Sequence, residues 1–155
     1  MAAKTPALTV LAQAGVAHRV HEYRHDPSVA SYGLEAAQKL GVEPQRVFKT
    51  LIVDVDDKLI VAVAPVEAQL DVRALGKRAA MADPKLAERT TGYVAGGISP
   101  LGQRKRLPTL VDESALAFET IFVSGGRRGL EIELAPADLV ALTGAETRSV
   151  VVRRS

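Results

Sequence analysis

Two β-strand patterns that directly follow each other, at residues 48–55 and 58–64, constrain the fold of this chain more than any other feature. Asp56 and Asp57 separate the two patterns, and a polar two-residue connection between apolar runs is typical of a β-hairpin. Residues 59–63 are apolar at every position, which indicates a strand that is covered on both faces and therefore central in its sheet. The sequence thus predicts a sheet built around an antiparallel pair.

Helix signals and further strand patterns flank this hairpin on both sides. Capping residues, prolines and glycines predict helices at residues 6–14, 34–40, 71–79, 84–89 and 136–142. Alternating or β-branched runs predict strands at residues 16–23, 107–112, 119–124, 130–134 and 150–152. Because tight turns join several neighbouring strands, a purely parallel, doubly wound sheet is disfavoured. We expect an α/β (α+β) fold, with a mixed, barrel-like sheet surrounded by helices, in a single domain over residues 1–155.

The composition excludes several classes of function. The chain of 155 residues contains no cysteine, which removes disulfides, zinc–thiolate and iron–sulfur sites, and a protein thiol nucleophile. Its net charge is only +2 and 4% of its residues are aromatic, so neither DNA binding nor stacking on single-stranded RNA is favoured. No signal-peptide pattern opens the sequence, and the longest apolar run, residues 59–65, is too short to span a membrane. We expect a cytoplasmic protein without a membrane partner.

A loop rich in glycine and positive charge, residues 91–108, is the strongest candidate for ligand binding. Gly96 and Gly97 allow positive φ and let a ligand closely approach the backbone amides. Pro100 stiffens the exit from the loop, and a basic triplet follows at Arg104, Lys105 and Arg106. This combination suits a small polar ligand that carries phosphate. The glycine spacing matches neither a Rossmann fingerprint nor a P-loop, so we expect no nucleotide cofactor and no other cofactor.

Lys49 and Tyr23 are two further candidates for pocket residues. By the two-residue period of a strand, Lys49 shares a face with the apolar residues Leu51, Val53 and Val55. A lysine in that position either extends to water or points into a cavity, where a low dielectric strengthens the effect of its charge. Tyr23 ends the first predicted strand, where its hydroxyl either closes a pocket or caps an apolar surface. The pattern leaves both alternatives open for each residue.

The histidines and Ser124 form no recognisable metal or catalytic motif. His18 and His21 point to opposite faces of the first predicted strand and His25 lies beyond it, so we expect no metal site. The residues that flank Ser124 do not match a nucleophile elbow, and no histidine is near it in the sequence. Basic pairs add to the basic triplet, and the first of them borders a glycine-rich turn, which favours phosphate contact: Arg127–Arg128 and Arg153–Arg154.

Five strings of residues occur in this chain in an order and spacing that a known family shares. They are residues 21–27 (HEYRHDP), 47–51 (VFKTL), 81–84 (MADP), 99–103 (SPLGQ) and 123–134 (VSGGRRGLEIEL). On these strings, which extend over nearly the whole chain, the sequence resembles the YbaK-type Cys-tRNA(Pro) deacylases. These proteins are relatives of the editing domain that is inserted in bacterial prolyl-tRNA synthetases. The resemblance implies a mixed, barrel-like sheet wrapped by helices, in agreement with the pattern of elements.

The resemblance also implies a set of site residues. The implied catalytic residues are Lys49, Gly96 and Tyr23. The implied substrate-binding residues, which include the glycine loop and the late hairpin, are Thr50, Gly97, Ile98, Ser99, Pro100, Ser124 and Glu131. Glu131 departs from the family pattern, because a member of that family has aspartate at this point. The extra methylene shifts the carboxyl group and leaves its role open.

The function implied by the resemblance is trans-editing, the removal of cysteine from mischarged Cys-tRNA(Pro) and also from Cys-tRNA(Cys). In that family the thiol of the substrate attacks its own ester and releases a thiolactone. The enzyme then has to hold a reactive conformation and stabilise developing charge, without a nucleophile of its own. The implied partners are aminoacyl-tRNA and prolyl-tRNA synthetase. We expect the tRNA phosphates to contact Arg104, Lys105, Arg106, Arg127 and Arg128.

Two other functions are compatible with the same residues. A related domain could clear a different mischarged tRNA, such as Ala-tRNA(Pro), since the sequence does not give the volume of the pocket. A module that binds RNA ends or nucleotides without catalysis would use the same glycine loop and basic clusters. Such a module would bind tRNA in a salt-dependent manner and would not deacylate it.

Overall fold

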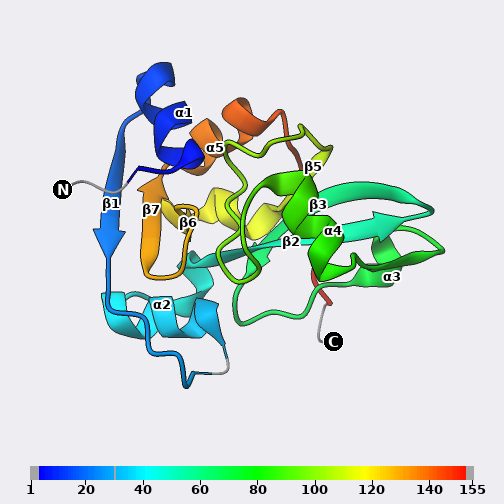
Figure 1. Cartoon of the computed structure of the whole chain (residues 1–155), viewed down its shortest axis with the longest axis horizontal. Helices are drawn as coiled ribbons and strands as arrows, with labels where there is room; N and C mark the ends of the chain where they lie inside the picture. The colour runs from blue at the N-terminus through cyan, green and yellow to red at the C-terminus, as the bar shows by residue number, and fades with distance from the viewer. Residues whose placement is uncertain (1–3, 30, 153–155) are drawn as a thin grey trace.

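Two β-sheets and the helices around them form the structure, a computed structural model that describes residues 4–29 and 31–152 (Figure 1). The first sheet has the order β1-β7-β6 and is antiparallel throughout, with β1 at His18–Glu22, β7 at Leu130–Leu134 and β6 at Ile121–Ser124. The second sheet has the order β4-β2-β3-β5-β8 and is mixed. Its strands are β4 at Ala79–Met81, β2 at Phe48–Val55, β3 at Lys58–Pro65, β5 at Thr109–Asp112 and β8 at Glu146–Arg148. The predicted mixed α+β class is confirmed.

The predicted hairpin at the centre of the second sheet is confirmed. β2 and β3 pair antiparallel from Phe48–Pro65 at one end to Val55–Lys58 at the other. Asp56 and Asp57 form the turn at φ 53° and 68°, the pair of left-handed residues that a tight hairpin turn with the twist of its strands requires. β3 also pairs in parallel with β5, so it is a central strand, as its continuous apolar run predicts.

Each predicted helix is present, with differences in its bounds. The helix predicted at 34–40 begins at Tyr32, and those predicted at 84–89 and 136–142 end at Thr91 and Thr143. The helix predicted at 71–79 differs more and is described below. The helices are α1 at Pro6–Ala14, α2 at Tyr32–Leu40, α3 at Val72–Leu75, α4 at Pro84–Thr91 and α5 at Pro136–Thr143, with 3₁₀ turns at Pro44–Arg46 and Glu113–Ala117. The side chains of Thr5, Ser31 and Asp83 each accept a hydrogen bond from the third amide of the helix that follows. Left-handed glycines then end four of these helices, at Gly15, Gly41, Gly92 and Gly144.

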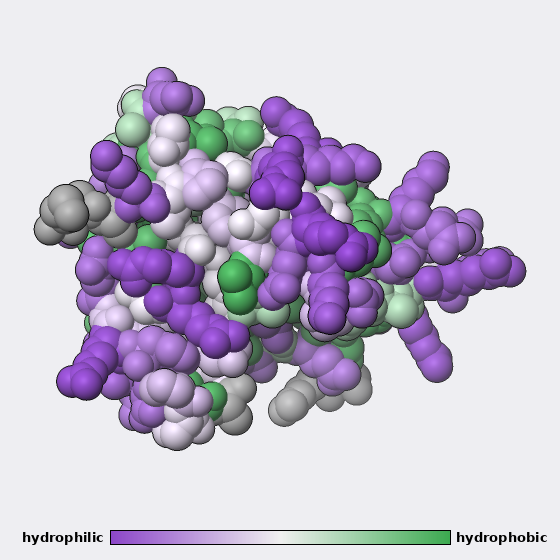
Figure 2. All heavy atoms as spheres, in the orientation of Figure 1, coloured by the Kyte–Doolittle hydropathy of each residue, from purple (hydrophilic) through white to green (hydrophobic). Residues whose placement is uncertain are grey.

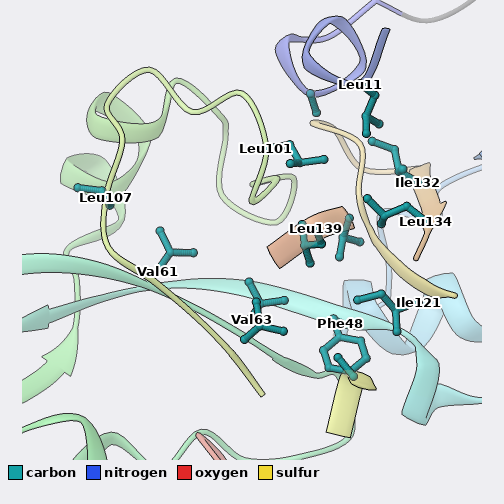
Figure 3. Packing of buried hydrophobic residues seen from close by; sticks show 14 of the residues in the cluster. Leu11, Phe48, Val61, Val63, Leu101, Leu107, Ile121, Ile132, Leu134 and Leu139 are labelled. Atoms are coloured by element: carbon teal, nitrogen blue, oxygen red, sulfur yellow. The ribbon is translucent and has the colours of Figure 1, made fainter. Parts of the chain in front are cut away.

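The main hydrophobic core lies where the two sheets, the helices α1, α4 and α5 and the glycine loop meet (Figure 3). Phe48 and Val63 enter it from the second sheet, and Ile132 from the first. Leu11 of α1 and Leu139 of α5 cover it, both fully buried. Two smaller clusters flank this core, one under α2 (Ala36, Ala37, Val47, Val66, Phe122) and one on the far face of the second sheet (Val53, Ala62, Ala64, Leu70, Val150).

The glycine loop is anchored in that core and is a fixed part of the structure. Leu101 faces the same core as Ile132 and is 2% exposed (Figure 3). The hydroxyl of the buried Tyr93 donates to the carbonyl oxygen of Leu101 over 2.6 Å. Burial of these side chains holds both ends of the segment from Tyr93 to Leu101, so the loop presents its remaining backbone in a defined conformation.

Two predicted elements are wrong, and the structure gives a physical reason for each. The helix predicted at residues 71–79 is only the short α3, because Gly76 ends it in an extended conformation and Ala79 already pairs with Val55 as part of β4. The strand predicted at residues 150–152 makes a single bridge, between Val151 and Leu70, while β8 lies earlier in the chain. The β-branched residues of this segment reflect the burial of Val150, and they do not form part of a β-sheet.

The barrel-like closure that we expected is also not formed. Within residues 4–29 and 31–152, the two sheets are separate ladders that are joined by an isolated parallel bridge between Val47 and Phe122. In this part of the chain, no ladder continues between the two sheets beyond that bridge. In the same described part of the chain, no helix has the length and apolar character needed to cross a membrane.

Asp112 connects the C-terminal segment to β5 and provides a test of this arrangement. Its buried carboxylate accepts hydrogen bonds from the amides of Val150, at 2.9 Å, and Ser114, at 3.2 Å. Asp112→Ala leaves the buried Val150 amide without a partner and should lower the free energy of unfolding by about 1–3 kcal/mol. Asp112→Asn keeps one acceptor oxygen and should cost less. Urea denaturation measures both losses, and equal losses for the two variants would contradict this role.

Candidate active site

A cavity of about 250 Å³ lies beside the bridge that joins the two sheets, and it brings together most of the site residues that the sequence analysis selected. It is enclosed by the end of the first strand, the start of α2, the first half of β2, the glycine loop and the β6–β7 turn. The selected residues that line it are Tyr23, Lys49, Thr50, Gly96, Ile98, Ser124, Arg127, Arg128 and Glu131. Residues separated by up to about a hundred positions in the chain thus share one enclosure.

The Val47–Phe122 bridge explains why these residues meet. It is a parallel bridge, so β2 and β6 leave it in the same direction. Lys49 lies two residues beyond the bridge on one strand, and Ser124 lies two residues beyond it on the other. Glu131 is the register partner of Ser124 in the first sheet, and their side chains share a face. The two sheets therefore contribute facing walls to the cavity.

Lys49 lines this cavity, and its ammonium is held by a backbone carbonyl. Its Nζ donates to the carbonyl oxygen of Ala68 over 2.7 Å, and its side chain is half-buried. Burial lowers the pKa of the Lys49 ammonium below its ordinary value. An ammonium has three N–H donors, so two are left for a ligand. Leu51, Val53 and Val55 pack in the cluster on the far face of the second sheet, as the two-residue period predicts.

Glu131 is the acidic residue of the cavity, and its carboxyl group lacks a partner. The residue is 7% exposed, and within the described residues no hydrogen bond or ion pair reaches its carboxyl oxygens. Burial raises the pKa of Glu131 to about 8, so the group is mainly protonated at neutral pH. Glu133, two residues along β7, accepts from Thr120 Oγ1 at 2.6 Å and lies 2.9 Å from His21 Nε2, and these contacts lower its pKa.

The hydroxyl groups of the cavity are neutral and only partly engaged. Burial raises the pKa of Tyr23 to about 12, and the nearby Glu131 carboxyl acts in the same direction. Ser124 Oγ accepts from the Gly126 amide at 3.2 Å, which leaves its own hydrogen free to donate. Thr50 Oγ1 is buried without a partner among the described residues, a state that costs about 1–3 kcal/mol. A bound polar group would satisfy it.

The cavity has no nucleophile–base pair within the described residues. Among these residues, neither of its two serines, Ser31 and Ser124, forms a hydrogen bond with a histidine. Each histidine is held by another group: His18 by the Val16 carbonyl, His21 by Glu133 and His25 by Glu35. The same arrangement keeps the histidines apart, and the described part of the chain holds no group of three or more residues that could ligate a metal. The chemistry available is therefore the ammonium of Lys49, the guanidinium groups of Arg127 and Arg128 at the rim, neutral donors and backbone amides.

A contact across the rim of the cavity escaped the sequence analysis. The guanidinium of Arg128 lies 4.1 Å from the centre of the Tyr32 ring, and its Nη2 donates to the carbonyl oxygen of Ala95 over 2.8 Å. Gly96 has φ 84°, and a Cβ there would lie 2.6 Å from both Arg128 Nε and the Tyr32 ring. The rings of His25 and Tyr32 in turn pack edge to face, with their centroids 5.5 Å apart. Nothing local to Tyr32 signals this role, because it arises from three distant segments.

The loop amides divide into engaged and unengaged groups. The Ala95 amide donates to Glu88 Oε2 at 2.8 Å, and the Gly97 amide donates to the Val94 carbonyl at 2.9 Å. The amides of Gly96 and Ile98 have no partner within residues 4–29 and 31–152. Because both residues line the cavity, these two amides are the donors that the loop offers to a ligand.

The other selected residues lie outside the cavity. Gly97 packs against the backbone of Arg127, where a Cβ would come within 2.9 Å of Cα. Ser99 is fully buried, and its Oγ accepts from the Leu101 amide. Pro100 and Arg106 line a separate cavity of about 230 Å³ near α1 and α5, and Arg104 and Lys105 are exposed beside α4. The basic pair at residues 153–154 falls outside the described residues.

A larger cavity, of about 760 Å³, lies around the 3₁₀ turn at Pro44–Arg46 and the start of α5. None of the residues selected from the sequence lines it. Its most buried charges already satisfy each other, since Arg46 donates to the carbonyl oxygen and hydroxyl of Thr120 and approaches Glu133. The cavity of about 250 Å³, with its unpartnered carboxyl and hydroxyl groups, is therefore the better candidate for the active site.

Comparisons with known proteins relate the whole chain to one family. A model of the aminoacyl-tRNA editing domain family matches residues 26–142. A protein of Enterococcus faecalis assigned as a Cys-tRNA(Pro)/Cys-tRNA(Cys) deacylase, EbsC, is 36% identical over 157 residues, which cover 97% of this chain and 94% of that protein. Two crystal structures each have a TM-score of 0.83. One, of a protein assigned as a trans-editing enzyme for prolyl-tRNA synthetase, is 25% identical and covers 98% of this chain and 100% of its own. The other, of the hypothetical protein APE2540, is 26% identical and covers 96% and 100%.

The family match covers most of the chain, and the relative from Enterococcus faecalis aligns with nearly all of it. The solved structures extend the agreement to the whole fold. The chain therefore belongs to the aminoacyl-tRNA editing domain family.

Proposed function

We propose that this protein removes cysteine from mischarged Cys-tRNA(Pro), and also from Cys-tRNA(Cys), with the thiol of the substrate as the nucleophile. The observation that carries the proposal is the content of the cavity: a cation, loop amides and neutral donors, without a nucleophile–base pair among the described residues. The name of the relative from Enterococcus faecalis supports the same substrates. An enzyme built in this way contributes orientation and electrostatic stabilisation.

The proposed step balances without an added reagent. The sulfur attacks the ester carbonyl carbon, so a C–S bond forms and the C–O bond to the terminal ribose breaks. The thiol proton ends on the ribose oxygen, and the products are a thiolactone and free tRNA. Lys49 orients the terminal adenosine or its phosphate, and the Gly96 and Ile98 amides hold the ester carbonyl. Tyr23 and Ser124 line the pocket for the cysteine side chain.

Glu131 has a defined place in this proposal. Its carboxyl group is buried in the cavity wall, mainly protonated at neutral pH and free of protein partners among the described residues. A neutral carboxylic acid is a hydrogen-bond donor, which suits an oxygen that gains negative charge. We infer that Glu131 donates to the ester oxygen as the bond to the ribose breaks.

Prolyl-tRNA synthetase is the proposed partner that delivers the charged tRNA, and adding it to the assay should increase the rate.

The first prediction concerns substrate and cation together. Purified protein should release cysteine from Cys-tRNA(Pro), and Lys49→Ala should reduce kcat/KM by at least about a hundredfold, since it removes a charge from a low-dielectric site. Lys49→Arg keeps the charge but not the compact ammonium, so it should lose activity too. Release of labelled cysteine from charged tRNA measures these rates.

Controls in the same assay separate the alternatives. Ser-tRNA should be a poor substrate, because a hydroxyl is a much weaker nucleophile than a thiol. Fast hydrolysis of Ser-tRNA or Ala-tRNA(Pro) would mean that water attacks. Salt-dependent tRNA binding without release of any amino acid would show that the protein is a binding module and not an enzyme. Full activity in Lys49→Ala would remove this residue from the mechanism.

The second prediction concerns the rim. Gly96→Ala places a methyl group against Arg128 and Tyr32, so it should displace both and reduce deacylation by about tenfold or more. Gly92→Ala is the matched control, because Gly92 has φ 83° but its added Cβ would meet only Arg104, at 3.6 Å. Both variants bear the same backbone strain, so similar unfolding free energies with a large difference in kcat/KM are expected. Equal activities would contradict the crowding argument.

The third prediction concerns the pH dependence of stability that Glu131 confers. The pKa of Glu131 is about 8 in the folded protein, against an ordinary value of 4.5, so the folded state holds this proton over a wider range. Its contribution to stability is complete below pH 4.5 and is lost as pH rises through 8. Glu131→Gln, which is neutral at every pH, should match the wild type at pH 5 and exceed it at pH 9 in urea denaturation. Parallel profiles for the two proteins would show that Glu131 is ionised in the folded state.

A further inference from the structure

A second group of positive charges lies on the same face as the Arg127–Arg128 pair of the cavity rim. Lys85 and Arg89 lie one turn apart on α4, and both are exposed. The loop returns along the end of this helix, where the Arg104 amide donates to the Thr91 carbonyl at 2.9 Å and the Lys105 amide donates to Thr90 at 3.1 Å. Arg104 and Lys105 are also exposed. We call these four residues (Lys85, Arg89, Arg104, Lys105) the α4 strip.

The charges of the α4 strip are not neutralised by the protein. Within the described residues, none of its four side chains forms an ion pair or a hydrogen bond. The two nearest acids on α4 are already engaged, because Glu88 accepts from the Ala95 amide and Asp83 caps the helix through the Leu86 amide. Other basic residues, such as Arg78 with Asp56, do have acidic neighbours. The strip is therefore a concentrated positive surface in a chain of net charge +2.

The strip is connected to the cavity by a short piece of chain. α4 ends at Thr91, and the loop that follows reaches the rim at Gly96. Figure 2 shows two groups of strongly hydrophilic side chains on one face of the molecule, one over the β6–β7 turn and one over α4 and the returning loop. The glycine loop lies between these two groups. A polyanion whose end enters the cavity would thus meet positive charge on both sides of the entrance.

We propose that the α4 strip binds the phosphodiester backbone of the RNA substrate adjacent to its 3′ end, in the acceptor stem. This inference rests on the proposed function, which places the 3′ end in the cavity. Residues one helical turn apart lie about 6 Å from each other and can bind successive phosphates of one strand. Contacts of this kind position the RNA without reading its sequence, so they fit an enzyme that selects its substrate by the attached amino acid.

Arg106 is not part of the α4 strip, although it directly follows Lys105, because its side chain lies at the end of α5. Its Nη2 would lie 3.0 Å from a Cβ at Gly144, which is the residue that ends α5. A guanidinium there stabilises the negative end of the helix dipole. We therefore keep Arg104 and Lys105 as proposed phosphate contacts and no longer place Arg106 among them, since its side chain lies at the end of α5. Arg106→Ala removes the same charge from the same segment and is a matched control, and Lys58→Ala at the distant β2–β3 turn is a second.

The test compares a long substrate with a short one. The variant Arg89→Ala/Arg104→Ala/Lys105→Ala should raise KM for Cys-tRNA(Pro) by about ten- to a hundredfold with kcat nearly unchanged. A cysteinyl ester of a CCA trinucleotide does not reach the strip, so its kinetics should not change. The slope of log KM against log salt should fall by about one for each contact removed. Arg106→Ala and Lys58→Ala should behave as wild type.

Several results would contradict the proposed binding of RNA by the α4 strip. They are an unchanged KM for tRNA, an equal loss on the trinucleotide, and an equal effect of Arg106→Ala. A further experiment compares the binding of the wild type and the triple variant to anionic phospholipid vesicles. If the variant loses vesicle binding while its tRNA kinetics are unchanged, the strip binds a membrane surface instead of RNA. Filter binding of uncharged tRNA tests RNA binding by the strip independently of the proposed deacylase activity. If the wild type deacylates nothing, the strip still predicts weaker tRNA binding in the variant and normal binding in Arg106→Ala.

Discussion

The single bridge between Val47 and Phe122 determines where chemistry can occur in this molecule. Both residues are buried in the cluster under α2, so the two sheets are held together at this point, and no ladder of the described residues continues between them afterwards. β4 pairs only with the far end of β2, from Val53 to Val55, which leaves the near half of that edge unpaired. The cavity fills the resulting gap, and its two walls come from two separately folded ladders. A continuous barrel would have closed this space with main-chain hydrogen bonds.

The electrostatic character of the cavity follows from its partial burial. Burial lowers the pKa of Lys49 and raises the pKa of Glu131, and no ion pair joins these two groups in the described part of the chain. A cation and a neutral acid in one enclosure leave both available to a ligand, whereas an ion pair would satisfy them internally. Groups that are fixed before the substrate arrives need no reorganisation during a reaction. This is the physical reason why a cavity without its own nucleophile is consistent with catalysis.

Local signals predicted the elements of the fold well where each element carries its own information. The apolar run of β3, the prolines and caps at helix starts and the Asp56–Asp57 turn all specify their structure within a few residues. The short α3 and the position of β8 could not be predicted in this way, because pairing with strands distant in sequence decides them. The resemblance directed attention to Lys49, Glu131 and Gly96, which do line one cavity. Tyr32 was missed, and Gly97, Ser99 and Pro100 proved to shape the loop from outside, because side-chain direction in a loop depends on its anchors.

The rim also restricts how chains of this kind can vary. Tyr32, Gly96 and Arg128 come from three distant segments, yet the ring and the guanidinium already fill the space that a side chain at position 96 would need. Such positions do not change independently, because the effect of each substitution depends on the size of the other two. Descendants that acquire a larger residue at 96 therefore need a smaller one at 32, or a redirected one at 128. Among homologues these three positions should covary as a unit, a constraint that single-position comparisons would not reveal.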